Sequence, residues 1–406
     1  MADLDELKNR AVQLLDYNAR NEDGHFYIAP SCHKYPHQWS WDSSFHAIVN
    51  ARLGRVDLAK AEIISLLSAM TPDGHLPHII FRDRSFITLA TRLLRSYWPR
   101  SGHSPLLQPP VVALAIQEVW RRSEDRDFLK ETLPLLERHF IWLHARRRFG
   151  KSNLISILSP WESGLDHKPA FDKLMGRCAR LPLGLYFALY GSEIRLIQLN
   201  FDRDEIVKKS LFNVQDVMFN TIYALGLDAL AELFAVTDDR SKAEQYKKHC
   251  DVVENDILDE CFDAGSGLYF DVDVSSGKML MNPSITCLMP IALRNIEKER
   301  CEQIIHHLQN INEFWLNFPI PSVPASNPDF VAEDQRYLWR GPTWINTNWL
   351  IVEGLRRHGY NELADSIAEK SRELIWKSGF REYYNPFTGE GGGTRDFSWS
   401  TLAAVM

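Results

Sequence analysis

Residues Pro110–Arg148 read PVVALAIQEVWRRSEDRDFLKETLPLLERHFIWLHARRR, and this stretch predicts two helices joined by a short connector. Apolar residues recur at helical spacing from Pro110 to Arg122 and again from Asp127 to Arg148. The connecting sequence SEDRD offers side chains suited to capping the second helix, and it is too short to join parallel neighbours. We therefore expect an antiparallel helical hairpin here.

The same pattern recurs along most of the chain. Hairpins repeated about six times can close into a toroid, with inner helices buried all round and outer helices amphipathic. No composition break or linker divides the 406 residues, so a single domain over residues 1–406 is expected. Residues 264–283 alternate like strands and predict a small β-hairpin inserted between helices. The other expected helices span residues 5–20, 42–53, 56–70, 183–198, 214–236, 239–261, 297–308, 343–358, 361–377 and 397–406.

Composition narrows the classes of function. The formal net charge is −7 and the chain has no basic stripe, which argues against a nucleic-acid partner. There is no run of 18 apolar residues and no signal-peptide pattern, so neither a membrane span nor secretion is expected. The six cysteines form no CxxC pair and no metal-ligand spacing, which is typical of reduced thiols in the cytoplasm.

No cofactor or metal is expected. Pro77 lies between His75 and His78, and no third ligand is evident for a metal at that position. The run Gly391–Gly393 is not followed by the Gly-Lys-Ser/Thr of a phosphate loop. We interpret that run as a flexible loop that closes over a pocket.

Four aromatic clusters carry the unusual polar residues. They hold seven of the 12 tryptophans, together with carboxylate, amide and arginine side chains. A sugar ring needs an aromatic platform for its C–H face and polar partners for its hydroxyl groups, and each cluster offers both. Two of the clusters contain an acid, Asp166 and Glu382, which suggests an acid/base pair that cleaves a glycosidic bond. The alternative for any one cluster is a tryptophan-rich edge of the core. The clusters span residues 35–43, 159–172, 337–349 and 379–400.

The motifs QWSWDSSFHA, PWESGLD, YLWRGPTWINTNWL and GFREYYNPFTGEGGG, with FSWS following, occur in this order. Together they resemble glycoside hydrolase family 63, most closely its compact members that hydrolyse mannosylglycerate and glucosylglycerate. The resemblance covers the chain from about Tyr35 to its end. It implies an (α/α)6 barrel, inversion at the anomeric carbon, Asp166 as general acid and Glu382 as general base. The family's sugar-pocket residues fall on Trp39, Trp41, Asp42, Gln108, Trp339 and Arg340.

Other residues of the motifs complete the expected substrate site. Two positions depart from the family pattern, namely Leu165 before the acid, where a larger residue is common, and Phe81, where a tyrosine touching the acid part of the substrate is expected. The second departure counts against a bound glycerate. Lys168 and Arg177 are candidates for contacting an anionic aglycone, with solvated surface as the alternative. The further candidates for substrate binding are Tyr35, Gln38, Phe81, Trp161, Gly164, Tyr337, Trp344 and Trp399.

The proposed roles set electrostatic requirements. Asp166 must hold its proton near neutral pH, so its pKa must be raised, either by desolvation from burial and Trp161 or by repulsion from Glu162 or Asp42. Glu382 must stay ionised, which calls for a wetter setting or a nearby cation. Arg340 and Arg395 are the candidate cations.

These observations favour an intracellular, inverting α-glycosidase that acts on a small glycoside. The best single substrate class is an α-glucosyl or α-mannosyl glycerate. An α-glucosidase for short α-gluco-oligosaccharides or disaccharides is the alternative within enzymes. A helical-toroid sugar isomerase or epimerase, which would use histidines as acid and base, and a non-catalytic sugar-binding toroid are alternatives of other classes. The sequence leaves the oligomeric state open.

Overall fold

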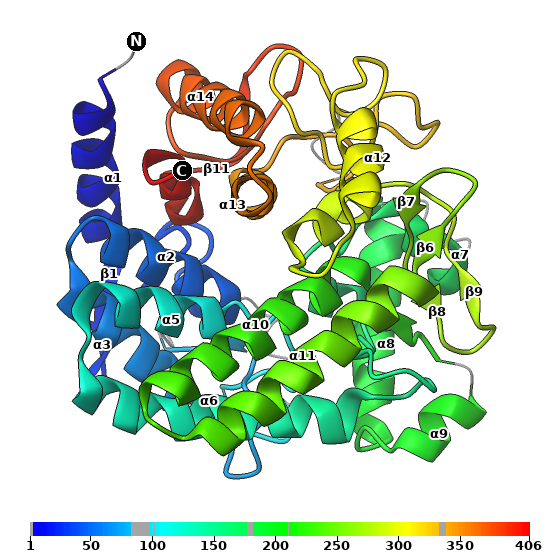
Figure 1. The fold of residues 1–406 in the computed structure, drawn as a ribbon, viewed down its shortest axis with the longest axis horizontal. Helices are drawn as coiled ribbons and strands as arrows, with labels where there is room; N and C mark the ends of the chain where they lie inside the picture. Colours follow the sequence, from blue (N-terminus) through cyan, green and yellow to red (C-terminus); the bar gives the residue numbers. More distant parts are fainter. Residues whose placement is uncertain (1–2, 83–97, 101, 177–181, 210, 333–337) are drawn as a thin grey trace.

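The computed structural model describes residues 3–82, 98–100, 102–176, 182–209, 211–332 and 338–406. Within these ranges the protein is mostly helical (Figure 1). The α-helices are α1 (Leu4–Asn18), α2 (Ser40–Arg52), α3 (Val56–Leu67), α5 (Val112–Ser123), α6 (Arg126–Arg147), α7 (Asp172–Met175), α8 (Pro182–Gln198), α9 (Arg203–Lys208), α10 (Val217–Val236), α11 (Arg240–Glu260), α12 (Lys298–Leu308), α13 (Ile345–Arg357) and α14 (Asn361–Ser378).

The hairpin expected over residues 110–148 is formed by α5 and α6. Helix α5 ends at Ser123 and is followed by Glu124, which has a positive φ of 49°. Asp125 caps α6 by accepting from the backbone N–H groups of Asp127 and Phe128. A side-chain cap of this kind satisfies donors that the first turn of a helix leaves unpaired. The short connector therefore turns the chain back on itself as predicted.

Six helical segments pack side by side in a closed circuit of contacts. In chain order they are α2, α5, α10, the 3-10 helix η4 (Ile285–Ala292), α13 and the 3-10 helix η5 (Ser398–Ala404). Each contacts the next, and η5 contacts α2. Most residues of α10 and α13 in this circuit are buried, as expected for helices covered on nearly all sides.

Six of the other described helices pack against this circuit. Helix α3 contacts α2 and α5, α6 contacts α5 and α10, α11 packs along α10, α12 contacts η4, and α14 contacts α13 and η5. The N-terminal helix α1 packs on η5, so the two ends of the chain lie close together (Figure 1). Inner and outer helices thus alternate along the chain, and three of the inner segments, α2, α13 and η5, begin within the sequence of an aromatic cluster.

The strands are short and antiparallel. The predicted hairpin at residues 264–283 is two hairpins, because β6 (Phe262–Asp263) pairs with β7 (Leu268–Tyr269) and β8 (Val272–Asp273) pairs with β9 (Lys278–Met279). Strand β8 also pairs with β5 (Val214–Gln215), just before α10. The remaining pairs are β1 (Ala19–Glu22) with β2 (His25–Ile28), β3 (Gln38–Trp39) with β4 (Ile79–Ile80), and β10 (Arg381–Tyr384) with β11 (Gly391–Arg395).

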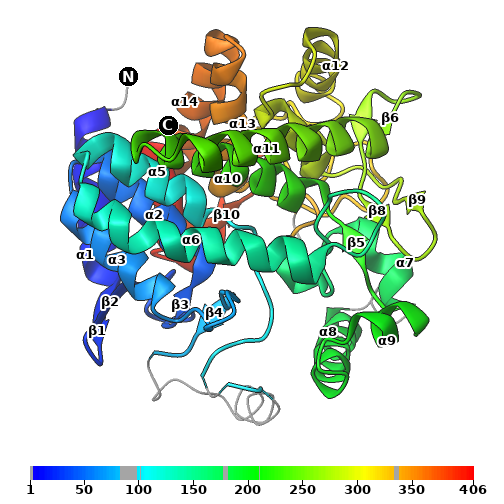
Figure 2. The same cartoon turned by 60° about the horizontal axis from the view of Figure 1, so that its bottom comes forward.

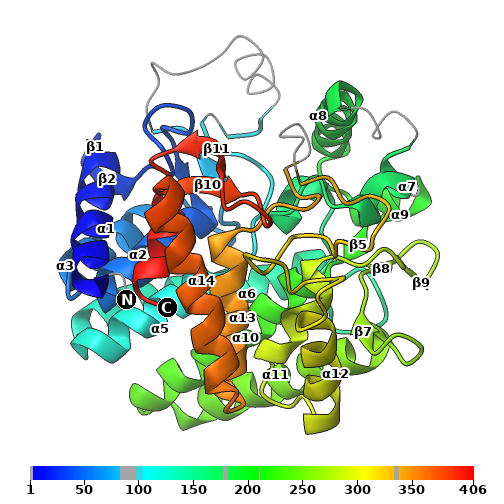
Figure 3. The same cartoon turned by 90° about the horizontal axis from the view of Figure 1, so that it is seen from above.

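Figures 2 and 3 show which end of the molecule is built from loops and strands. The β3–β4 pair and helices α8 and α9 lie along the lower edge in Figure 2, away from α11. Seen from the direction of Figure 3, the β10–β11 pair lies next to α14, with which β10 is in contact. The β3 strand directly precedes α2, and the β10–β11 pair directly precedes η5.

Helix α10 needs a separate comment because of its composition. Among the described helices it is the one long and apolar enough to cross a membrane, although 89% of its apolar window is buried inside the fold. Its apolar character is explained by its place in the inner circuit, where α5, α6, α11 and η4 cover it.

Candidate active site

The segment that carries Asp166 is held by buried polar contacts on its N-terminal side. It begins with η1 (Pro160–Ser163), in which Glu162 is fully buried. The Glu162 carboxylate accepts two hydrogen bonds from the Arg147 guanidinium, at 2.8 and 2.7 Å, and one each from the backbone N–H groups of Leu107 and Leu158. With four donors and no remaining exposure, Glu162 fastens the loop to α6.

Asp166 occupies a four-residue turn directly after this anchor. The N–H of Lys168 donates to the carbonyl of Leu165 at 2.9 Å, which closes the turn around Asp166. The Asp166 side chain remains 22% exposed, so it can reach a ligand, while the neighbouring His167 side chain has no exposed area. The acid is therefore presented on a turn whose base is buried.

Burial raises the pKa of Asp166, and weaker contacts oppose this shift. The opposing contacts are the electrostatic effect of His167, a backbone hydrogen bond within the Asp166 residue and a hydrogen bond from the Trp339 side chain. Burial also lowers the pKa of His167, which favours its neutral form and weakens its effect on the acid. Burial is the largest cause of the shift, as the sequence led us to expect, whereas neither Glu162 nor Asp42 is among its causes.

Glu382 lies in β10 and not in a loop, and its side chain is only 5% exposed. The Tyr35 hydroxyl donates to Oε1 at 3.1 Å, and the backbone N–H of Thr394 in β11 donates to Oε2 at 2.9 Å. The Lys34 ammonium lies 4.0 Å from Oε2. Two donors and a cation stabilise negative charge on this carboxylate, as a general base requires.

The cation beside Glu382 differs from the candidates named from the sequence. Arg340 is buried and its guanidinium binds the Asp172 carboxylate with two hydrogen bonds, of 3.0 and 2.5 Å. Its Nε also donates to the carbonyl of His167 at 3.0 Å. Arg340 thus ties the third cluster to the Asp166 loop, and the cation found within 4.0 Å of Glu382 among the described residues is Lys34.

Aromatic contacts bring the clusters together. Trp41 at the start of α2 meets Trp399 of η5 edge to face, with ring centroids 5.6 Å apart, and Trp344 lies 5.8 Å from Trp399. Trp344 stacks on Trp339, with centroids 3.6 Å apart and an angle of 10° between the planes. Gly164 lies against the Trp41 ring so closely that an added Cβ would sit 2.4 Å from it. Segments from all four clusters therefore converge at one place.

Asp42 lies between these groups in the first turn of α2. It is 2% exposed, and its Oδ1 has no hydrogen-bond partner. Burial raises its pKa to about 7, with a smaller increase from the Glu382 charge and an opposing effect of His46. A buried carboxylate oxygen without a donor is costly, and a sugar hydroxyl would supply that donor.

The other expected site residues have more varied surroundings. The Gln108 side chain accepts from the Trp41 N–H at 3.0 Å and so caps α2, whereas the buried Gln38 side chain accepts from Arg82 at 3.0 Å. Trp39 packs edge to face on Tyr35, and its buried Nε1 has no hydrogen-bond partner. Tyr337 lies outside the described residues.

Two more expected residues lie toward α8 and β4. Phe81 packs against His37 and Trp98, with ring centroids 4.2 and 5.3 Å away. Trp161 packs edge to face on Tyr190 of α8, 5.0 Å away. Both rings are half-buried, and each leaves part of its surface open.

Three expectations from the sequence need correction or fall away. The Lys168 side chain is fully buried, so it is neither solvated nor free to meet an aglycone. Gly391–Gly393 belongs to β11 and is not a flexible loop, and its glycines leave room for Tyr383 and for the Glu382 carboxylate. Arg177 lies outside the described residues. In the part of the chain that is described, no group of three or more His, Cys, Asp or Glu side chains is arranged to hold a metal.

Sequence reasoning missed the contacts of Lys34 and Thr394 with Glu382. The glycine run was the available signal for Thr394, since a strand without side chains can approach a partner closely. At Gly393, which has a φ of 63°, an added Cβ would lie 2.5 Å from Glu382 Oε2. No local pattern marks Lys34, because its contact spans almost the whole chain.

Comparison with known proteins gives a consistent result. A family model described as mannosylglycerate hydrolase MGH1-like glycoside hydrolase domain matches residues 35–400. The chain is 30% identical to a mannosylglycerate hydrolase of Thermus thermophilus over 98% of this chain and 99% of the relative. It is 29% identical to a glucosylglycerate hydrolase of Mycolicibacterium hassiacum, over 92% and 91% of the two chains. The crystal structure of the Thermus thermophilus GH63 enzyme with Tris and D-glycerate superposes with a TM-score of 0.88 at 30% identity, covering 98% of this chain and 99% of that one.

Proposed function

Since the chain belongs to the mannosylglycerate hydrolase MGH1-like glycoside hydrolases of family 63, we propose that it hydrolyses a small α-mannoside or α-glucoside. The chain is a glycoside hydrolase, and its best substrates on this proposal are mannosylglycerate and glucosylglycerate. The observation that carries the assignment is the pair of carboxyl groups in opposite settings. Asp166 is desolvated and favours its proton, whereas Glu382 is surrounded by two donors and a cation.

We assign the fold as a single (α/α)6 barrel. The closed circuit of inner helices and the outer helices packed around it support this assignment. The free thiols of Cys32, Cys250, Cys261, Cys287 and Cys301 support a cytoplasmic location, because disulfides are rare in reducing compartments. The reaction needs no cofactor on this proposal.

In the proposed reaction, Asp166 protonates the oxygen that leaves with the aglycone. The raised pKa favours the protonated form of the carboxyl before the glycosidic bond breaks. Its partial exposure, 22% of the side chain, leaves the acid open to the substrate. A positioned acid of this type contributes about 10²- to 10⁴-fold to the rate.

Glu382 would accept a proton from a water that attacks the opposite face of the sugar. The Tyr35 hydroxyl and the Thr394 N–H hold the two carboxylate oxygens in fixed directions, which favours one water position. Attack from that face while the leaving group departs on the other inverts the anomeric configuration. The α-glycoside therefore yields the β-sugar.

The sugar itself would sit among the converging aromatic rings and Asp42. Trp41, Trp339 and Trp399 supply apolar faces, and the unpartnered oxygen of Asp42 would accept from a hydroxyl group. The buried Trp39 Nε1, which has no acceptor, is a matching donor for a sugar oxygen. These orphaned polar atoms favour a polyhydroxylated ligand over an apolar one.

Phe81 supports a second candidate function, hydrolysis of short α-gluco-oligosaccharides or disaccharides. Phe81 carries no hydroxyl for the carboxylate of glycerate, and it presents a half-buried apolar ring instead. An aromatic ring is a suitable platform for a second sugar unit. The relative rates of hydrolysis of glycerate glycosides and disaccharides distinguish the two aglycones.

The test is hydrolysis of a panel with glucosylglycerate, mannosylglycerate, kojibiose, nigerose, maltose and trehalose, followed by proton NMR of the fresh product. We expect release of a β-sugar from a glycerate glycoside, and loss of at least about 10²-fold in kcat for Asp166→Asn and Glu382→Gln. Preferred cleavage of a disaccharide would support the second candidate instead. Cleavage by both variants at the wild-type rate would refute the acid and base assignments and favour the histidine-based isomerase or the sugar-binding toroid.

A further inference from the structure

Lys168, the last residue of the turn that carries Asp166, has a buried side-chain ammonium group. Lys168 has no exposed side-chain area, and its Nζ lies 2.6 Å from Asp216 Oδ2 and 2.6 Å from Asp271 Oδ2. Its Nζ also lies 3.5 Å from Thr286 Oγ1 and 4.5 Å from the centre of the Phe171 ring. Burying a charge this completely costs several kcal/mol per ion, on the order of what its partners return.

The two carboxylates are themselves fixed to the start of α10. Asp216 caps this helix by accepting from the N–H of Phe219 at 2.7 Å, and Asp271 accepts from the N–H of Val217 at 2.9 Å. Lys168 therefore joins the Asp166 turn to the first turn of an inner helix. Through Thr286 it also reaches η4, the next segment of the inner circuit.

The backbone of Lys168 sets the direction of Asp166. Lys168 is the last residue of the turn that its own N–H closes onto the carbonyl of Leu165, and its carbonyl accepts from the N–H of Phe171 at 3.1 Å. A shift of the Lys168 backbone would therefore rotate the turn in which Asp166 stands. The contacts of Glu162 hold the N-terminal side of the loop, ahead of the turn, so they do not fix the turn itself.

We propose that Lys168, bound between Asp216 and Asp271, is a positioning residue that holds the general acid against the leaving group. This inference rests on the proposed role of Asp166. Lys168 does not reach substrate, because its side chain is completely enclosed. Lys168 links the Asp166 turn to α10 and thereby fixes the position of the acid. This matters because a misplacement of about 1 Å at a catalytic group can lower the rate about 10²-fold.

The test uses two substrates that differ in their need for an acid. The first is the best glycerate glycoside or disaccharide from the panel, whose leaving oxygen needs protonation. The second is the α-glycosyl fluoride of the same sugar, whose fluoride leaves without full protonation. For Lys168→Met we expect kcat on the glycoside to fall about 10²-fold with KM little changed, and kcat on the fluoride to fall less than about threefold.

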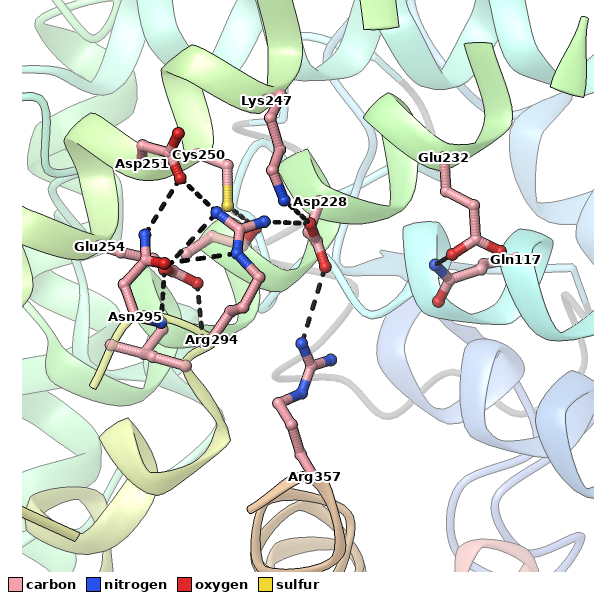
Figure 4. Close-up of polar contacts among 12 residues, drawn as sticks. Gln117, Asp228, Glu232, Lys247, Cys250, Asp251, Glu254, Arg294, Asn295 and Arg357 are labelled. Atoms are coloured by element: carbon pink, nitrogen blue, oxygen red, sulfur yellow. Dashed lines mark hydrogen bonds and ion pairs between the residues drawn. The ribbon is translucent and has the colours of Figure 1, made fainter. Parts of the chain in front are cut away.

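The matched control removes another ion cluster that joins α10 to its neighbours. Arg294 binds Asp228 of α10, Asp251 of α11 and Glu254, as Figure 4 shows. Asp228 lies twelve residues beyond Asp216, about 18 Å along the helix. Arg294→Met should lower thermal stability while leaving the ratio of the two activities unchanged.

A second variant keeps the proposal testable if Lys168→Met fails to fold, because Lys168→Met leaves the buried carboxylates of Asp216 and Asp271 without their cation. Asp271→Asn keeps the pair of Lys168 with Asp216 and should show a smaller loss with the same preference for the fluoride. Equal losses on both substrates in either variant would overturn the positioning role. Asp166→Asn is measured alongside, because a failure of this variant to discriminate between the substrates would instead overturn the acid assignment itself.

Discussion

Asp166 and Glu382 are both carboxylic acids, and the atoms around each separate their proposed roles. Burial beside neutral His167 favours the protonated form of Asp166. The Tyr35 hydroxyl, the Thr394 N–H and the Lys34 ammonium favour charge on Glu382. The residue type alone does not distinguish the two roles, because the surroundings of each carboxyl group depend on how the chain folds.

Asp42 provides a prediction at the residue scale. Its pKa rises from an ordinary 3.8 to about 7 on folding, so between these values the folded protein binds more protons than the unfolded chain. The stabilisation from Asp42 is therefore fully present below about pH 4 and is lost as pH rises through about 7. Between pH 5 and pH 8 this loss amounts to about 3 kcal/mol of the free energy of unfolding.

Asp42→Asn should remove that dependence. Denaturant unfolding at pH 5 and pH 8 should show a smaller decrease in stability for this variant than for the wild type. Asp57→Asn, in a fully exposed side chain of α3, is the control and should follow the wild type. An identical decrease in all three proteins would show that Asp42 does not titrate in this range.

At the scale of elements, β11 supports the base through its lack of side chains. Gly393 has a φ of 63°, and an added Cβ would lie 2.5 Å from Glu382 Oε2 and 2.7 Å from Tyr383 Cε1. Gly393→Ala should displace the Glu382 carboxylate and lower kcat by about 10²-fold. Steady-state kinetics on the best substrate of the panel measures this loss.

The chain offers a control with the same backbone conformation. Gly277 in the β8–β9 turn has a φ of 67° and no atom within 4 Å of an added Cβ. Gly277→Ala pays the same backbone penalty of about 1 kcal/mol without touching the site, so it should lower stability and leave kcat unchanged. If both variants lost activity equally, strain in the fold would be the cause and the contact with Glu382 would not matter.

At the scale of the whole molecule, the circuit of helices depends on joining the two ends of the chain. Asn18 at the end of α1 is fully buried, and its Nδ2 donates to the Asp396 carbonyl and to Ser398 Oγ, each at 2.8 Å. Its Oδ1 accepts from the N–H of Cys32 at 3.2 Å. The Asn18 side chain therefore links α1 to Cys32, to Asp396 and to Ser398 at the start of η5.

Asn18→Ala should lower the free energy of unfolding by about 2 kcal/mol, because it leaves buried donors and acceptors unpaired. Denaturant midpoints measure the effect. Asn312→Ala at an exposed position is the control and should change stability by less than about 0.5 kcal/mol. An Asn18 variant as stable as the control would show that the contact between the chain ends adds nothing to the fold.

The sequence by itself determined the helices and the motifs. Helical periodicity located α1, α2, α3, α5, α6, α10 to α14 and α8 within a few residues, because each buries a regular apolar face. It missed η4, where Pro290 interrupts the helical pattern, and it gave no sign that Glu382 lies in β10, which pairs with β11. The roles of Asp166 as acid and Glu382 as base came from the resemblance of the motifs to glycoside hydrolase family 63.

Only the tertiary structure decided what surrounds those residues. Local sequence sets backbone preference and the face that a helix buries, but a buried charge takes its partner from wherever the fold brings the chain. Lys34 meets Glu382 across most of the chain length, and Lys168 finds Asp216 and Asp271 on segments far downstream. Such pairs leave no periodic signal, because desolvation and charge compensation depend on distance in space and not on separation in sequence.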